Sequence, residues 1–288
     1  MARGWIGAGL LALLLAGCVS TGGPGALVSA PCVSPAESGD AEIAAVAGAA
    51  PGLCARSLAI RDGSLTIPLV MLDTGRPGPL FVVPHDDENA ALAAGVTALG
   101  RHGGRLVAVR ARGQRDLVTA SGVRVDPNRI FGDRSTGAVC PGGRRPSVAY
   151  TEAVLGARMP RQPIIGLHSN KPGPPLSSRP APKGMTAIFP ATPPVRGDRL
   201  ADPDTFLIVP VGVGAAERAR VAGKVARFTD AGATVLIETI TPPGDCSLSS
   251  FLVLSGQPDY VTLEVRDGDR ATSERLIELV LGRSGGSV

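Results

Sequence analysis

The chain has 288 residues and a formal net charge of +4, from 29 Lys and Arg against 25 Asp and Glu, and aromatic residues make up only 3% of it. The basic residues are scattered, so no run of charge indicates a nucleic-acid surface, and the few aromatic rings offer no stacking platform for bases. The length suffices for one large domain with a sizeable core.

The N-terminus carries an export signal. Arg3 precedes an apolar run from Trp5 to Leu15, which is too short for a bilayer core that needs roughly 20 apolar residues, so residues 1–17 are a predicted signal peptide. The following Leu15-Ala16-Gly17-Cys18 resembles the lipobox of bacterial lipoproteins. That resemblance implies an acylated Cys18 and attachment to the membrane through this lipid alone. Val19 follows where an inner-membrane retention signal would usually carry Asp, which indicates an outer-membrane position facing the periplasm. A cleaved signal with an incidental cysteine is the alternative.

Residues 18–52 are rich in Gly, Ala, Ser and Pro and show little periodicity. Such composition is typical of a flexible linker. We therefore expect a lipidated tether over 18–52 and a folded domain over 53–288.

Four cysteines remain after Cys18. An exported protein meets an oxidising compartment, where an even number of cysteines favours disulfides. Three connectivities are open, and the one that keeps the first pair inside the N-terminal segment joins Cys32 to Cys54 and Cys140 to Cys246. No CxxC pair occurs, which disfavours a structural zinc site.

Short apolar runs alternate with helix-like stretches through the domain. This alternation predicts an α/β fold with a mixed, largely parallel sheet flanked by helices, in which ligands gather at the carboxyl ends of strands. The predicted strands are Leu80–Val83, Leu106–Val109, Ile164–Leu167, Phe206–Val209, Val235–Ile237 and Val261–Val265, and the predicted helices are Asn89–Leu99, Ser147–Arg158, Ala215–Asp230 and Ser273–Leu281.

The segment 171–198 contains eight prolines and no helix or strand pattern. A loop of this length inside a compact domain is usually functional or disordered. Because it follows His168, we expect it to cover the substrate, with a surface insertion as the alternative.

Two of the three histidines stand directly after predicted strands. His85 follows the first strand with Glu88 three residues later, and His168 follows the strand that ends at Leu167. A catalytic zinc site uses three protein ligands, for which imidazole and carboxylate are suitable, and leaves a fourth position open. An isolated HxxE pattern is common, however, and a histidine near a strand end is more often structural.

A further motif, Val125-Asp126-Pro127-Asn128-Arg129-Ile130-Phe131, lies between the two histidines. The order HxxE, Asp-x-Asn-Arg-x-Phe and Leu-His resembles the aspartoacylase and succinylglutamate desuccinylase branch of the zinc carboxypeptidase superfamily. The resemblance implies a zinc carboxypeptidase-like fold with zinc bound by His85, Glu88 and His168. It also implies that Asn128 and Arg129 hold a substrate carboxylate, a task that suits the planar fork of arginine.

The same family uses a late glutamate to activate the zinc-bound water and to pass its proton to the leaving amine. Glu264 lies in a late predicted strand at the corresponding place, and Glu238, at the end of another strand, is the competitor. A second substrate-binding arginine is also expected, and Arg110, Arg115 and Arg124 remain open for it.

The sequence thus predicts a zinc-dependent amide or peptide hydrolase of the cell envelope, acting on a small peptide, including peptidoglycan peptides, or on an acyl-amino acid with a free carboxylate. An N-acyl amino acid deacylase is one alternative, and a non-catalytic envelope-binding lipoprotein is another. The run Pro84-His85-Asp86-Asp87-Glu88 also resembles the motif of zinc de-N-acetylases. That family needs a later HxxH, which this chain lacks.

Overall fold

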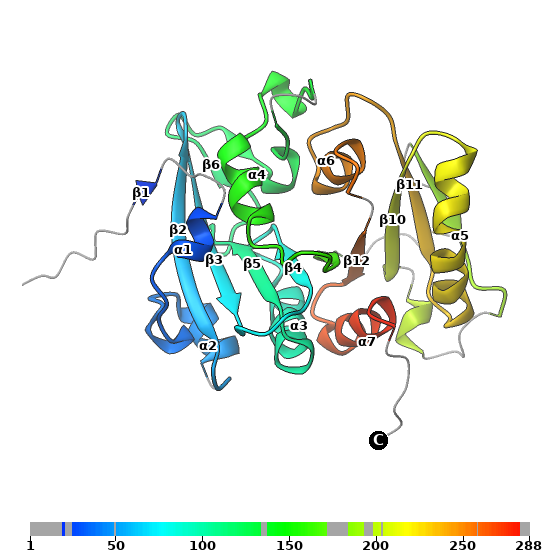
Figure 1. Ribbon diagram of the computed structural model, residues 1–288, viewed down its shortest axis with the longest axis horizontal. Helices are drawn as coiled ribbons and strands as arrows, with labels where there is room; N and C mark the ends of the chain where they lie inside the picture. The colour runs from blue at the N-terminus through cyan, green and yellow to red at the C-terminus, as the bar shows by residue number, and fades with distance from the viewer. Residues whose placement is uncertain are drawn as a thin grey trace, which may run out of the picture.

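The computed structural model describes most of the chain, and Figure 1 shows its path. The described residues are 19–20, 25–48, 50–133, 137–171, 184–192, 198–202, 204–257 and 259–282. The predicted signal peptide, Cys18 and most of the proline-rich loop 171–198 lie outside the described residues. No helix in the described part is long and apolar enough to cross a membrane.

A ten-stranded mixed sheet runs through the described structure in the order β1-β2-β3-β5-β4-β8-β12-β10-β11-β9. At its centre β5, β4, β8 and β12 are parallel neighbours, whereas β3 and β10 flank them in the antiparallel direction. The strands are β1 Val19–Ser20, β2 Cys54–Asp62, β3 Leu65–Asp73, β4 Leu80–Val83, β5 Arg105–Val109, β8 Ile164–Asn170, β9 Met185–Ile188, β10 Phe206–Gly212, β11 Val235–Ile240 and β12 Tyr260–Arg266, with a separate hairpin of β6 Leu117–Val118 and β7 Arg124–Val125.

Helices cover both faces of this sheet (Figure 1). One core contains apolar residues of α2, α3, α5 and α7, and the core on the opposite face contains residues of α1, α4 and α6. The helices are α1 Ala26–Ser29, α2 Ala41–Ala47, α3 Asn89–His102, α4 Val148–Leu155, α5 Ala215–Asp230, α6 Leu248–Leu254 and α7 Arg270–Val280. The predicted α/β class, a mixed and largely parallel sheet flanked by helices, is confirmed.

All six predicted strands and all four predicted helices form, with shifts at their ends. The predicted helix 147–158 ends at Leu155 because Gly156 is its C-cap. The last helix begins three residues early, at Arg270, because the Asp269 side chain accepts a hydrogen bond from the Thr272 amide.

The hairpin of β2 and β3 was not predicted, although a local signal was present. Its strands pair antiparallel from Cys54–Asp73 to Asp62–Leu65 and are joined by Gly63 and Ser64. Gly63 has a φ of 57°, a backbone conformation that glycine adopts without steric cost. Asp62-Gly63 between two half-alternating apolar runs is a strong short-range hairpin signal.

The expected tether is wrong for the described residues between 25 and 48. Leu27 of α1 and Ile43 of α2 are fully buried, each in a different core. The Asp40 side chain accepts hydrogen bonds from the amides of Glu42 and Ile43 and so caps α2. These residues therefore belong to the folded body, and β1 before them also joins it by pairing with β2.

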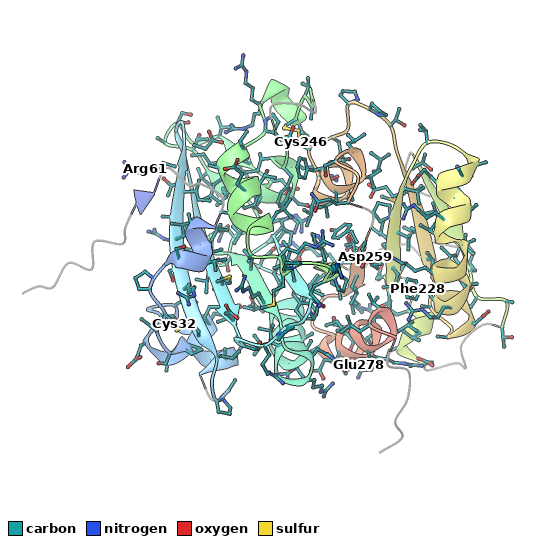
Figure 2. All side chains as sticks on the ribbon, viewed as in Figure 1. Cys32, Arg61, Phe228, Cys246, Asp259 and Glu278 are labelled. Atoms are coloured by element: carbon teal, nitrogen blue, oxygen red, sulfur yellow. A yellow bond between two sulfur atoms is a disulfide. The ribbon has the colours of Figure 1, made fainter. Side chains whose placement is uncertain are left out.

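Two disulfides form, and the pairing that keeps the first one within the N-terminal segment is confirmed. Cys32 is joined to Cys54 with a Cα–Cα distance of 5.4 Å, and Cys140 to Cys246 with 5.2 Å. Figure 2 shows the two bridges in separate regions, with Cys32 near α2 and Cys246 beside α6.

We predict opposite effects of alanine at two helical glycines. A Cβ at buried Gly95 in α3 would overlap Leu106 Cδ1 and lie 2.9 Å from Leu167 Cδ1, whereas exposed Gly223 in α5 has nothing within 4 Å. Gly95→Ala should lower the free energy of unfolding by about 1–3 kcal/mol through overpacking, and Gly223→Ala should raise it by about 1 kcal/mol. Urea unfolding measures both, and equal stability of the two variants would contradict the packing of α3 on the sheet.

Candidate metal centre

Parallel pairing of β4 with β8 brings the two histidine motifs together. Leu80, Phe81 and Val82 lie opposite Ile164, Ile165 and Gly166, so the carboxyl ends of the two strands lie at the same edge. His85 follows β4 in the turn before α3, and His168 is the fifth residue of β8.

His85, Glu88 and His168 form one buried cluster. One potential ligand atom from each residue lies within 4.8 Å of the others, and their exposed fractions are 1%, 3% and 5%. His85 Nδ1 lies 2.8 Å from Glu88 Oε1, and His168 Nδ1 lies 3.4 Å from Glu88 Oε2. This set of two imidazoles and one carboxylate can bind a metal ion and is that of many catalytic zinc sites.

The chemistry of the cluster fits a cation. Glu88 Oε2 is buried and makes no well-aligned hydrogen bond to the described residues, although a carboxylate oxygen in such a place needs a partner. Burial raises the pKa of Glu88, but His168 and His85 outweigh this effect and hold it at about 2. Glu88 is therefore an anion around neutral pH, as a metal ligand must be.

Asp126 completes the surroundings of His85. Its Oδ1 lies 2.9 Å from His85 Nε2 and also accepts a hydrogen bond from the Asn128 amide at 2.7 Å. Burial lowers the pKa of His85, but the carboxylates of Asp126 and Glu88 outweigh it and raise the pKa to about 9. Only an imidazolium donates from both ring nitrogens. Without a metal ion, the protonated His85 ring therefore supplies the positive charge between Glu88 and Asp126.

Asp126 belongs to the motif between the two histidines, but its contact with His85 was not predicted. A carboxylate that accepts the second N–H of a metal-binding histidine fixes the ring and its tautomer. An aspartate two residues before the Asn-Arg pair was therefore a usable signal.

Glu264 lies directly opposite His168 in the pairing of β12 with β8. Register partners on adjacent strands point to the same face of a sheet, and the charged groups that act on Glu264 are His168, Glu88, His85 and Arg115. Burial raises the pKa of its carboxyl group. A partly buried carboxyl group beside the cluster, but outside it, is suited to proton transfer.

Glu238 lies elsewhere. It belongs to β11, two strands from β12, and hydrogen bonds to Ser249, with Asp245 and Arg129 as its charged neighbours. The sheet order thus favours Glu264 over Glu238 as the glutamate next to the candidate ligands.

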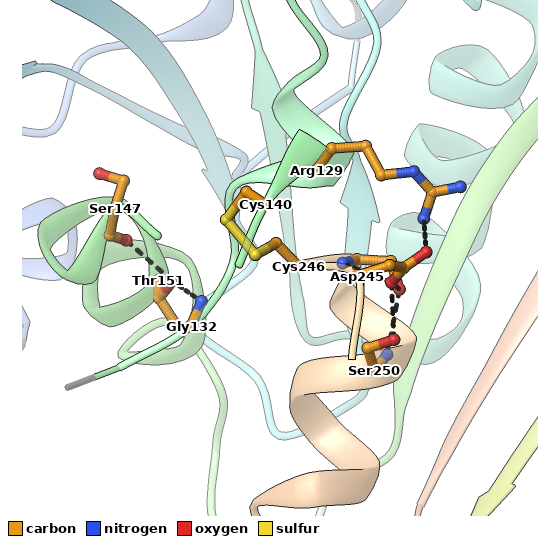
Figure 3. Close-up of a disulfide and its surroundings, with 9 residues drawn as sticks. Arg129, Gly132, Cys140, Ser147, Thr151, Asp245, Cys246 and Ser250 are labelled. Carbon is orange, nitrogen blue, oxygen red and sulfur yellow. Dashed lines mark hydrogen bonds and ion pairs between the residues drawn. A yellow bond between two sulfur atoms is a disulfide. The ribbon is translucent and has the colours of Figure 1, made fainter. Parts of the chain in front are cut away.

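Asn128 and Arg129, the predicted carboxylate clamp, contact the loop before α6. Arg129 Nη1 donates to Asp245 Oδ2 at 2.8 Å, beside the Cys140–Cys246 disulfide (Figure 3). The Asn128 Oδ1 atom accepts a weak hydrogen bond from the Leu248 amide at 3.3 Å. Arg129 therefore already faces a carboxylate of the protein itself, and it is 40% exposed.

The three arginines left open by the sequence have different surroundings. Arg110 is mostly buried and pairs with Asp40, Glu42 and Asp86. Exposed Arg124 pairs with Asp116. Only Arg115 of the three reaches the cluster, because its Nη1 donates to Glu88 Oε1 at 3.0 Å while its side chain stays 45% exposed. It is thus the arginine available to a ligand at the metal centre.

Other candidate groups are engaged elsewhere. His102, at the far end of α3, has its Nε2 atom 2.9 Å from Glu278 of α7. Asp86 accepts from the Gly113 amide at 2.8 Å and pairs with Arg110, so it is not free to act as the base that the de-N-acetylase motif requires.

A cavity of about 190 Å³ lies away from this cluster. Ile164 and Tyr260, the first residues of β8 and β12, line it together with Lys224 and Phe228 of α5. It therefore opens at the amino ends of these strands, opposite the end that carries the histidines.

Comparisons with known proteins find similarity among solved structures. No family model matches this chain, and no curated protein matches it. The crystal structure of an aspartoacylase family protein from Mesorhizobium loti is similar, with 18% sequence identity, a TM-score of 0.41 and coverage of 83% of this chain and 70% of that one.

We predict that the metal-free protein loses stability as the pH rises from about 6.5 to about 9. The pKa of His85 is raised from 6.5 to about 9 by folding, so its contribution is complete below the lower value and is lost as the pH rises through the higher one. Urea unfolding at a series of pH values, in the presence of a chelator, measures the free energy of unfolding. Asp126→Asn removes one of the two carboxylates and should reduce the loss, and an unchanged pH profile in this variant would contradict the assignment.

Proposed function

We propose that this protein is a zinc-dependent hydrolase of amide or peptide bonds that acts in the cell envelope. The observation that carries the proposal is the convergence of His85, Glu88 and His168 in one buried cluster, with Glu264 in register beside His168. The motif order in the sequence supports the same activity, because it resembles the aspartoacylase branch of the zinc carboxypeptidase superfamily.

Zinc would be held by His85, Glu88 and His168, with Asp126 orienting the first histidine. Bound there, the ion supplies an activated water, with a pKa near 7, and polarises the scissile carbonyl. Two histidines and one carboxylate leave a coordination position for these tasks.

Glu264 is our candidate for the proton carrier. It takes a proton from the attacking water and delivers it to the leaving nitrogen, which no ligand can do while it binds the metal. The burial that raises its pKa brings a carboxyl group toward the range in which it both accepts and donates protons near neutral pH.

Arg115 and Arg129 have separate tasks in this proposal. Arg115, next to Glu88, stabilises the negative charge that develops on the scissile carbonyl oxygen. Arg129 and Asn128 bind a free carboxylate of the substrate. Arg129 does so through the guanidinium N–H groups that do not donate to Asp245. A small peptide, including a cell-wall stem peptide, or an acyl-amino acid has the required amide and carboxylate.

We further propose that the protein is anchored by a lipid on Cys18 and faces the periplasm. The predicted signal peptide and lipobox support this location. The two disulfides are consistent with it, because disulfides persist in oxidising compartments.

Glu264→Gln should abolish most of the turnover and leave zinc binding intact. General acid–base catalysis typically contributes 10²- to 10⁴-fold, so kcat should fall by about 100-fold or more. A panel of peptides, stem peptides and N-acyl amino acids supplies the substrates, and atomic absorption measures bound zinc. His168→Ala should instead weaken zinc binding itself. Near-normal turnover of the Glu264→Gln protein would make Glu238 the candidate proton carrier instead. Glu238→Gln serves as the matched variant.

No hydrolysis of the whole panel by a zinc-loaded protein would favour a binding lipoprotein over an enzyme. Cleavage of N-acyl amino acids alone would favour the deacylase alternative. The panel thus separates the three functions that the sequence leaves open.

Arg129→Lys should raise KM for substrates with a free carboxylate much more than for their amidated counterparts. Lysine keeps the charge but lacks the planar fork that binds a carboxylate through two hydrogen bonds. Steady-state kinetics on matched acid and amide substrates measure the difference, and exposed Arg124→Lys is the control. Equal changes of KM on both substrates would remove Arg129 from carboxylate binding.

A further inference from the structure

The turn that carries two of the candidate ligands has little regular structure of its own. Residues 84–88 connect β4 to α3, and the backbone hydrogen bond recorded within the turn, from the Glu88 amide to the His85 carbonyl, is long at 3.4 Å. The positions of His85 and Glu88 therefore depend on contacts that the turn makes with its surroundings.

Asp86, between the two ligands, makes such contacts. Its side chain is fully buried. One oxygen accepts a hydrogen bond from the Gly113 amide at 2.8 Å, and the other pairs with Arg110 Nη1. Asp86 Oδ1 has no hydrogen-bond donor among the described residues besides this ion pair, so the position of the buried carboxylate depends on the charge of Arg110, because an unpaired buried carboxylate is costly.

Arg110, directly after β5, links Asp86 to the N-terminal segment. Its Nε donates to Asp40 Oδ2 at 2.6 Å and its Nη2 to Asp40 Oδ1 at 3.1 Å, and Nη2 also pairs with Glu42. All three guanidinium nitrogens thus contact carboxylates, and the side chain is 12% exposed. Three acidic groups around one arginine hold it in a single orientation.

The N-terminal segment is itself firmly attached to the domain. Ile43 and Ala47 of α2 are fully buried in the core that contains α3. The Cys32–Cys54 disulfide joins the segment to the start of β2. Asp40 and Glu42 therefore have a rigid support that does not belong to the metal-binding turn.

We infer that Arg110 is a positioning residue for the metal centre: the N-terminal segment, through Asp40 and Glu42, holds Arg110, and Arg110 holds Asp86 between the ligands His85 and Glu88. This inference rests on the proposed metal site. It makes residues 25–48 a part of the functional site, although none of them is a ligand.

The test is the zinc dissociation constant of the purified full chain, measured by competition with a chelator. Asp86→Asn and Arg110→Met should each raise it by about 10- to 100-fold, the usual effect of losing a group that supports a metal ligand. Arg110→Lys should recover part of the affinity. The double variant Asp40→Asn with Glu42→Gln alters only the outer end of the chain of contacts and should change affinity in the same direction.

A second buried ion pair supplies the matched control. Arg105 donates to Asp73 at 2.9 Å, between β5 and β3 and away from the ligands. Asp73→Asn should lower the unfolding temperature but leave zinc affinity unchanged. Circular dichroism establishes that each variant is folded before zinc is titrated.

Unchanged zinc affinity in the folded Asp86→Asn protein and in the outer double variant would overturn the inference while the metal site stands. An equal loss of affinity in Asp73→Asn would overturn it too, because the effect would then be one of general stability. Absence of zinc binding by the unaltered protein would overturn the proposed metal site and this inference together.

Discussion

The candidate centre depends on the parallel pairing of three neighbouring strands. β4, β8 and β12 run in the same direction, so their carboxyl ends lie at one edge. The register then sets which side chains meet: Glu264 lies opposite His168, and His85 follows the adjoining strand. A shift of one residue in β12 would turn Glu264 to the other face of the sheet, because side chains alternate along a strand.

Negative charge collects at this edge of the sheet. The carboxylates of Glu88 and Asp126 lie on either side of His85, and their charge outweighs the cost that burial imposes on a cation. The same arrangement that favours an imidazolium without metal favours a divalent ion with it, since both bring positive charge to the same place. The guanidinium of Arg115 offsets part of the negative charge of Glu88 and remains partly open to solvent.

Much of the fold could be predicted from local patterns, because the central strands are continuous apolar runs and α5 has clear limits. The candidate ligands were accessible for the same reason, since His85 and His168 each stand at the end of such a run. The hairpin of β2 and β3 and the packing of α1 and α2 were missed, because alanine-rich and half-polar stretches resemble linkers until their tertiary partners are known. The choice among Arg110, Arg115 and Arg124 needed three-dimensional neighbours that no spacing in the sequence contains.

The Cys140–Cys246 disulfide has a consequence for how the protein can be produced. It closes a loop with a sequence separation of 106 residues, and a cross-link of that span restricts the unfolded chain by about 4.7 kcal/mol in the chain-entropy description. It also joins the segment after Arg129 to the residue next to Asp245 (Figure 3). Material made in a reducing cytoplasm would lose this restriction between the segment that precedes α4 and the loop that precedes α6, so preparations for biochemistry should pass through an oxidising compartment.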